Sequence, residues 1–229
     1  RRHAVGSADM ADPGLVPLLT PAVLCADARI GDGSLIGDPT EGALLALAAE
    51  GGLDPDALAA KTPRIAEIPF DSALKFMATF HQEGDAVQLW LKGAPDVLLA
   101  RSSRWRDAAG EAPLDDAARA AFLAENEALA GQALRVLALA GRRIPAHDFD
   151  PAASPTELLP WTDDLTLIGL VGIIDPPRPE AKEAIAVCRA AGVEVKMITG
   201  DHRITAAAIA RELDLEGEAH DGRELDGLD

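Results

Sequence analysis

The feature that most constrains the fold is a proline-rich stretch, DPPRP, at residues 175–179. Three prolines in four positions stiffen the backbone and stop the apolar strand predicted before them, over residues 165–174. The pattern before this point predicts short strands joined by polar turns, and the pattern after it predicts helix, strand and helix. The sequence therefore predicts two bodies, residues 1–174 and residues 175–229, with a hinge at 175–179.

The first body is expected to be an antiparallel sheet with flanking helices, an α+β fold. Predicted strands cover residues 64–70, 75–80, 87–91, 135–142 and 165–174. Predicted helices cover residues 41–50, with Thr40 as its cap, a short stretch that begins after Asp54, and 116–133, capped by Asp115. Residues 102–113 and 144–164 are expected to be loops.

The second body has an α/β pattern. Helices are expected over residues 180–191 and 202–213, on either side of a strand at 193–198, which is typical of a parallel sheet. A polar turn, Thr199-Gly200-Asp201, follows the strand at the position where doubly wound folds bind ligands. Its hydroxyl and the start of the next helix suit an anion. Residues 216–229 are acidic and Gly-rich, so we expect the α/β segment to be truncated.

Composition excludes several classes. The chain has 229 residues and a net charge of −17, which argues against nucleic acid or an anionic membrane as a general partner. Its two cysteines, Cys25 and Cys188, have no metal-ligand spacing and indicate a reducing compartment. No apolar run approaches the roughly 20 residues of a membrane helix. Because it begins at Arg1 with neither Met nor a signal pattern, we expect a fragment.

A candidate binding site centres on Lys92-Gly93-Ala94-Pro95, between a predicted strand and a short predicted helix. Lys92 would present a point charge at a strand end, and Gly93 would let a ligand come close to the backbone. Pro95 suits the first turn of a helix. This arrangement suits a planar anionic ligand such as a nucleotide.

Other residues strengthen that interpretation, although each has a plainer alternative. Phe70 at a strand end would stack on a base, or would belong to the core. Glu41 would bind a ligand, or would only complement a helix dipole. Lys75, expected on the adjacent strand, and Arg135 would reach a phosphate, or would be solvated surface cations. Cys25 is expected to be a core residue.

Five short stretches, in this order, resemble the cytosolic part of P-type cation-transporting ATPases, most closely the calcium-pump-like P2 branch. They are GDPTEGA at 37–43, PFDS at 69–72, KGAP at 92–95, DPPR at 175–178 and MITGD at 197–201. The resemblance implies that residues 1–174 form the nucleotide-binding domain. It also implies that residues 175–229 form part of a phosphorylation domain of the haloacid-dehalogenase-like type.

The resemblance assigns roles to single residues. It implies that Glu41 recognises the adenine amino group and that Phe70 stacks on adenine. Gly93 belongs to the same pocket. The remaining implied roles concern phosphate and the hinge: Lys75 and Lys92 line the pocket, Arg135 holds phosphates, Asp175 and Arg178 belong to the hinge near the nucleotide, and Thr199, Gly200 and Asp201 contact the γ-phosphate near Mg²⁺.

Two departures limit these implications. Ala73 and Leu74 replace charges that often follow the Phe-Asp pair in the family, which would weaken the grip on phosphate. The Asp-Lys-Thr-Gly-Thr stretch with the phosphorylated aspartate is absent from the sequence, so no catalytic residue is assigned. We therefore expect a fragment that binds ATP or ADP without turnover, on the cytoplasmic face of a membrane protein.

The implied partners are ATP or ADP, with Mg²⁺ as cofactor of the parent enzyme, and the rest of that enzyme, namely its phosphorylation, actuator and transmembrane domains. Nucleic acid is not an expected partner. Two alternatives stay open: a non-catalytic interaction module, and a free-standing phosphohydrolase of the haloacid-dehalogenase type. The missing aspartate argues against the second.

Overall fold

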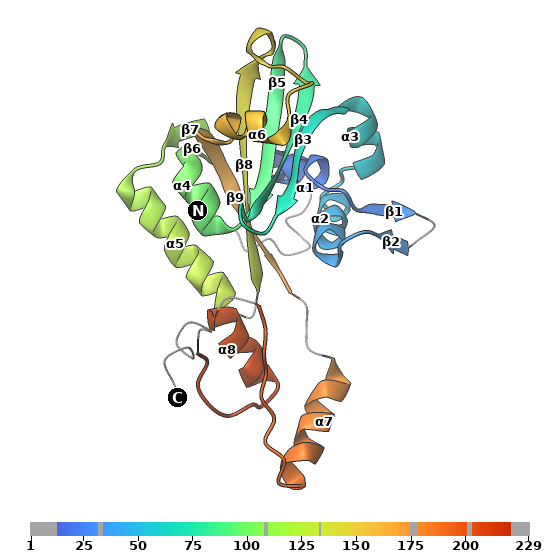
Figure 1. Cartoon of the computed structure of the whole chain (residues 1–229), viewed down its shortest axis with the longest axis vertical. Helices are drawn as coiled ribbons and strands as arrows, with labels where there is room; N and C mark the ends of the chain where they lie inside the picture. Colours follow the sequence, from blue (N-terminus) through green and yellow to red (C-terminus); the bar gives the residue numbers. More distant parts are fainter. Residues whose placement is uncertain are drawn as a thin grey trace. The chain divides into compact units, whose positions relative to one another are not determined.

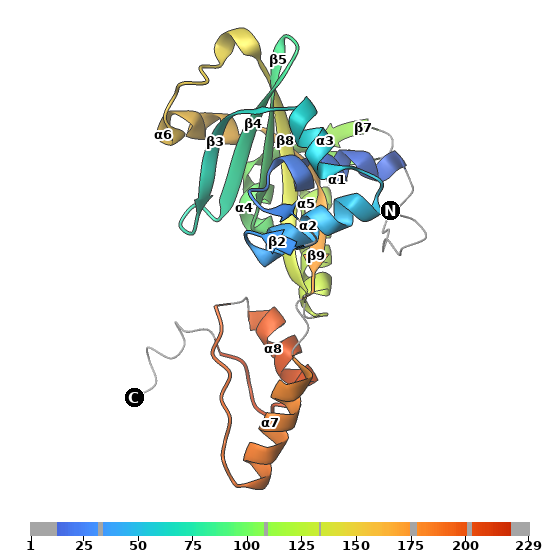
Figure 2. The same cartoon turned by 90° about the vertical axis from the view of Figure 1, so that its right-hand side faces the viewer.

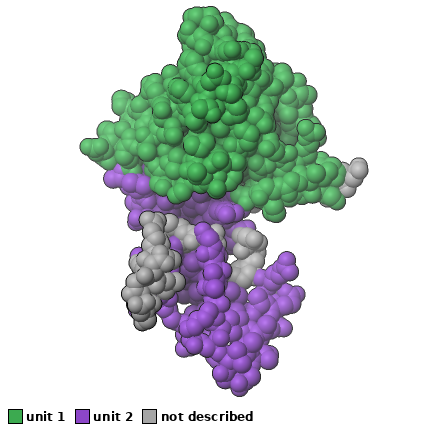
Figure 3. All heavy atoms as spheres, in the orientation of Figure 1, with its two compact units in different colours: residues 1–119, 137–171 green, residues 120–136, 172–229 purple. Residues whose placement is uncertain are grey.

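The structure is a computed structural model that describes residues 13–31, 34–107, 110–132, 134–174, 178–200 and 203–220. Its chain divides into two compact units (Figure 3). Unit 1 comprises residues 1–119 and 137–171, and unit 2 comprises residues 120–136 and 172–229. Of the predicted hinge, Asp175, Pro176 and Pro177 lie outside the described residues.

A seven-stranded sheet runs in the order β3-β4-β5-β8-β9-β6-β7 (Figure 1). Its strands are β3 (Arg64–Asp71), β4 (Phe76–Glu83), β5 (Ala86–Gly93), β6 (Ser102–Asp107), β7 (Gly110–Pro113), β8 (Arg135–Pro145) and β9 (Leu165–Ile173). Four of the neighbouring pairs, β3–β4, β4–β5, β5–β8 and β6–β7, are antiparallel, and β6 pairs with β9 in parallel. This confirms the expected α+β class with a mainly antiparallel sheet.

Three N-terminal helices pack together beside the sheet (Figure 2). They are α1 (Val16–Leu24), which follows a short 3₁₀ turn η1 (Pro13–Leu15), α2 (Pro39–Glu50) and α3 (Pro55–Lys61). Leu19 and Val23 of α1 and Leu45 and Ala48 of α2 form a buried cluster. A small hairpin, β1 (Arg29–Gly31) with β2 (Ser34–Ile36), joins α1 to α2.

The two faces of the sheet carry different side chains because residues alternate along a strand. On one face, Met77 and Trp90 pack against Leu24 and Cys25 at the end of α1. On the other face, Phe80 lies 4.9 Å from the Phe149 ring, centroid to centroid. Cys25 is fully buried, and burial raises the pKa of its thiol, so it is a core residue as expected.

The remaining elements of the chain are mostly short. In chain order they are α4 (Pro95–Arg101), α5 (Asp116–Ala130), η2 (Ala146–Asp148), α6 (Pro155–Leu158), η3 (Leu159–Thr162), α7 (Pro179–Ala190) and α8 (Arg203–Glu212). Pro95 begins α4 as predicted. Asp115 caps α5 as predicted, because its Oδ1 accepts the Ala118 N–H at 2.8 Å.

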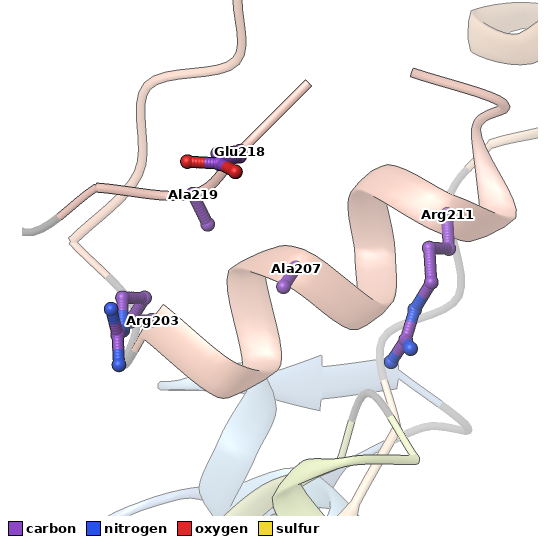
Figure 4. A pocket seen from close by; sticks show the side chains of 5 residues that line it. All are labelled: Arg203, Ala207, Arg211, Glu218 and Ala219. Carbon is purple, nitrogen blue, oxygen red and sulfur yellow. The ribbon is translucent and has the colours of Figure 1, made fainter. Parts of the chain in front are cut away.

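Unit 2 contains α7 and α8. Lys182 of α7 lies 2.9 Å from Asp214, which follows α8. Arg203, Ala207 and Arg211 of α8 line a pocket together with Glu218 and Ala219 (Figure 4).

Three of the predicted elements are wrong. Residues 102–113 form the β6–β7 hairpin and not a loop; its charged side chains, among them Arg104 and Glu111, hid the strand pattern. Residues 193–198 belong to no strand, because a strand needs a hydrogen-bonded partner and the described residues offer this segment none. Residues 144–164 carry the short helical turns η2, α6 and η3.

Two predicted positions also change. Lys75 does not lie on a strand: it ends the turn between β3 and β4, at a φ of 59°. Asp38, and not Thr40, caps α2, because its Oδ1 accepts the N–H groups of Thr40 and Glu41 at 2.8 and 3.3 Å. The Asp38 carboxylate, two residues before the predicted cap, reaches both amides, so the helix begins at Pro39.

A substitution at Gly141 of β8 would test how tightly this strand packs against Trp90 of β5. A Cβ there would lie 2.6 Å from two ring carbons of Trp90, so we expect Gly141→Ala to lower the free energy of unfolding by about 1–3 kcal/mol. Gly200→Ala, where an added Cβ meets nothing within 4 Å, is the matched control. Urea unfolding measures both, and equal stabilities of the two variants would contradict this account of packing.

Candidate functional site

Lys92, the next-to-last residue of β5, is the centre of the candidate site. It lies inside the sheet, between Met77 of β4 and Leu139 of β8. Its Nζ lies 2.5 Å from Glu41 Oε1 and 3.2 Å from Met77 Sδ, and it donates to the Cys25 carbonyl. The Lys92 and Glu41 side chains are 9% and 12% exposed, so they form a buried ion pair. Two predicted site residues thus lie in direct contact.

Glu41 is held by the start of α2 and by the segment after α1. It occupies the first turn of α2, where the helix dipole favours an acidic residue. Its Oε2 accepts the N–H groups of Asp27 and Ala28 at 2.8 and 2.7 Å. Helix-dipole complementarity is therefore only part of its role, since the carboxylate joins α2 to Lys92 and to two backbone amides.

Gly93 and Lys75 come together through their backbones. An added Cβ at Gly93 would lie 2.6 Å from the Lys75 carbonyl oxygen, and the same oxygen accepts the Ala94 N–H at 3.0 Å. The group that approaches Gly93 is therefore the chain itself, whereas the sequence suggested a ligand. Asp71 shapes the turn that ends at Lys75, because its Oδ1 accepts the Ala73 and Leu74 N–H groups at 2.7 and 3.1 Å.

Phe70 lies near the end of β3 with 64% of its surface exposed, so it is not a core residue. The strand register aligns Asp71 with Phe76 and Phe76 with Gly93. Phe70 and Lys75 therefore lie at the same end of β3, β4 and β5 as the Lys92-Gly93 pair. An exposed aromatic ring and an exposed lysine at the same end of the sheet as a buried ion pair can bind a flat base and an attached anion.

The other predicted site residues belong to unit 2. Arg135 is the exposed first residue of β8, and Arg178 is the exposed residue before α7. Thr199 and Gly200 are exposed in a bend that precedes α8. Asp175 and Asp201 lie outside the described residues. The contacts that join predicted site residues in unit 1 are those between Glu41 and Lys92 and between Lys75 and Gly93.

A buried polar chain lies beneath the segment that follows α1. The Thr79 hydroxyl lies 3.3 Å from the Leu24 carbonyl and 3.0 Å from His81 Nε2. His81 Nδ1 lies 2.9 Å from the Thr62 carbonyl. Burial lowers the pKa of His81, and the nearby Arg64 charge lowers it further, so the ring is neutral in the folded chain at neutral pH.

Sequence reasoning missed the backbone groups that surround Lys92 and Glu41. These are the Cys25 carbonyl and the amides of Asp27 and Ala28. Backbone groups leave no trace in residue identity, so no sequence signal would have found them. Arg64 was also missed. The sequence does contain a signal for it, because it is a single cation at the start of the predicted Arg-Ile-Ala-Glu-Ile strand.

A family model described as "P-type ATPase, cytoplasmic domain N" matches residues 15–180. The chain belongs to this family.

Curated relatives agree with this assignment. The chain is 40% identical over 93% of its length to a cation-transporting ATPase of Synechocystis, and 42% identical over 93% to a calcium-transporting ATPase of Bacillus subtilis. It is also 43% identical over 79% to a probable cation-transporting ATPase F of Mycobacterium tuberculosis. The chain spans 24% of each of the first two relatives and 19% of the third, about a quarter of their length or less. None of the helices in the described part of this N domain is long and apolar enough to cross a bilayer.

Removing one member of the ion pair should be costly. We expect Lys92→Met to lower the free energy of unfolding by about 3–5 kcal/mol, because Glu41 would stay buried without its cation. The double variant Glu41→Gln with Lys92→Met should recover part of this loss. Urea unfolding of these two variants and of Glu41→Gln alone, with the exposed Lys61→Met as control, measures the coupling. Additive single and double effects would contradict a coupled pair.

His81 should make stability depend on pH. Its pKa is lowered in the folded chain, so below about pH 6.5 the unfolded chain binds more protons than the folded chain. The contribution of the neutral His81 ring to the free energy of unfolding should therefore be fully present above about pH 6.5. It should be lost progressively as the pH decreases below that value. Urea unfolding at a series of pH values across this range gives the free energy of unfolding as a function of pH. Its slope should be shallower for His81→Gln than for the unsubstituted chain. The exposed His147→Gln is the control, and identical slopes for His81→Gln and the unsubstituted chain would refute the assignment.

Proposed function

We propose that this N domain binds ATP for a P-type cation-transporting ATPase whose full chain couples ATP hydrolysis, through an aspartyl phosphate, to cation transport. The observation that carries the proposal is the exposed ring of Phe70 at the strand ends that also present Lys75 and the Glu41–Lys92 pair. An exposed aromatic ring is unfavourable in water unless a ligand covers it. A purine base, which is flat and apolar on both faces, fits it.

Each residue then has a chemical role. Phe70 stacks on adenine, and Glu41 accepts a hydrogen bond from the adenine amino group. Its Oε1, already bound by Lys92, keeps a second lone pair for this bond. Guanine has a carbonyl at the same position and would repel the carboxylate, so ATP should bind better than GTP. Lys75, exposed on its turn, faces the phosphate side.

We further propose the two-domain assignment, with residues 1–174 as the nucleotide-binding domain and residues 175–229 as part of a haloacid-dehalogenase-like phosphorylation domain. In that assignment Arg135, Arg178, Thr199 and Gly200, with Asp175 and Asp201, approach the phosphates in the parent enzyme. The described part of the chain groups no three His, Cys, Asp or Glu side chains together. In nucleotide sites Mg²⁺ is held by one or two carboxylates together with the phosphates and water, so in this assignment it would bind together with the nucleotide. We propose that the isolated chain binds nucleotide and does not turn it over.

Titration of the ¹⁵N-labelled chain with ATP and GTP tests this function. We expect saturable binding, a preference for ATP, and shifts at Phe70, Lys92 and Gly93. Phe70→Ala should weaken ATP binding by about 1–3 kcal/mol, because the stacking surface is lost. Val187→Ala, at a residue that is 69% exposed on α7, is the matched control and should change nothing.

The outcomes separate the alternatives. No saturable change up to about 10 mM ATP, which is weaker than about −3 kcal/mol, would contradict the proposal. ATP affinity that survives substitution of both Phe70 and Lys92 by alanine would favour an interaction module with a different site. Release of phosphate from p-nitrophenyl phosphate would favour a phosphohydrolase.

A further inference from the structure

Arg64, the first residue of β3, has four hydrogen-bond partners. Its Nη1 lies 2.7 Å from Asp27 Oδ1 and 2.6 Å from Glu67 Oε2. Its Nη2 donates to the Ala26 carbonyl at 2.7 Å and lies 3.4 Å from the Leu24 carbonyl. The side chain is 25% exposed, so these bonds form in a partly dehydrated place where charged hydrogen bonds are strong.

Three of these four partners belong to one short stretch, residues 24–28, which we call the linker strip. The strip leaves the end of α1 and has no regular secondary structure of its own after Cys25. From one side, Arg64 holds the Leu24 and Ala26 carbonyls and the Asp27 carboxylate. An irregular segment held at several points has fewer conformations open to its remaining backbone groups.

Those remaining groups are the ones that orient the candidate site. The strip's Asp27 and Ala28 amides donate to Glu41 Oε2, and its Cys25 carbonyl accepts from Lys92. The carbonyls of Leu24 and Ala26 thus point to Arg64, while the groups between and after them point to the ion pair. Arg64 contacts Leu24, Ala26 and Asp27. The Glu41–Lys92 pair contacts Cys25, Asp27 and Ala28, so the two together bind all five residues of the strip.

We propose that Arg64 is a positioning residue for base recognition: it holds the linker strip so that Glu41 presents its carboxylate to the purine. This rests on the proposed nucleotide function. Arg64 does not touch the nucleotide in this account. Without the guanidinium, the two amides lose their fixed direction, and Glu41 loses the donors that set its rotamer. Its discrimination between an amino group and a carbonyl on the base then weakens.

The experiment compares ATP and GTP affinities by calorimetry for the full chain and for Arg64→Ala. We expect Arg64→Ala to weaken ATP binding about tenfold, since several charged hydrogen bonds support the strip, and to weaken GTP binding less. The ATP-to-GTP ratio should therefore fall. Arg64→Lys keeps the charge without the two-pronged geometry and should give an intermediate ratio.

Glu67→Ala is the matched control. Glu67 accepts a hydrogen bond from the same guanidinium, and among the described residues no hydrogen bond joins its side chain to the linker strip, so its loss should leave both affinities within about twofold. Amide hydrogen exchange of Asp27 and Ala28, measured without nucleotide, reports the strip directly. Their protection should fall in Arg64→Ala and persist in Glu67→Ala.

The possible results distinguish a positioning role of Arg64 from a purely structural one. A lower ATP-to-GTP ratio with lost protection at Asp27 and Ala28 would support the positioning role. Equal losses for ATP and GTP would reduce Arg64 to a general stabiliser and overturn it, as would unchanged affinities. Lost amide protection with an unchanged ratio would show that the strip does not control the base. If the unsubstituted chain binds neither nucleotide, the proposed function itself fails, and this inference falls with it.

Discussion

The buried ion pair between Lys92 and Glu41 is the interaction on which the arrangement of unit 1 depends. A charge removed from water is tolerated only when its hydrogen-bonding groups find partners. Lys92 finds a carboxylate, a carbonyl and a thioether, and Glu41 finds the lysine and two amides. These partners come from β5, β4, α2 and the strip after α1. The demand for full pairing therefore fixes four parts of the chain against one another.

The same demand separates residues that hold the site from residues left free to bind. Lys92 and Glu41 are largely used by the protein itself, and Gly93 is used by the turn that ends at Lys75. Phe70 has no comparable use, because it is exposed at the end of an edge strand. In a chain with only 3% aromatic residues, a ring placed in water is a stronger sign of recognition than any single charge.

Sequence reasoning succeeded where the local pattern and the fold agree. The helix α2, the strand β3 and the cap at Asp115 follow from periodicity and from side chains that bond to nearby amides. It failed at the β6–β7 hairpin, whose stability comes from pairing with β9, a strand about 60 residues away in sequence. It also failed at Lys75, which was predicted to lie on a strand. Lys75 has a left-handed backbone conformation in a turn, and its carbonyl oxygen lies close to Gly93. Long-range pairing and backbone contact leave no short-range signal.

The segment at residues 193–198 also shows that a strand depends on long-range pairing, here because the pairing is missing among the described residues. Its residues have the β-branched and apolar character of a buried strand, yet Ile198 is 95% exposed and no described strand pairs with the segment. Strand propensity measures how well side chains fit a pleated, half-buried surface, and it cannot supply the neighbours that make one. Apolar residues exposed next to a polar Thr-Gly turn gain nothing in water, so the side chains of this segment favour burial against neighbours. The proposed assignment of residues 175–229 to part of a phosphorylation domain would supply such neighbours from the rest of the parent enzyme. It would also explain why the sequence pattern of a parallel strand is present where the strand itself is not.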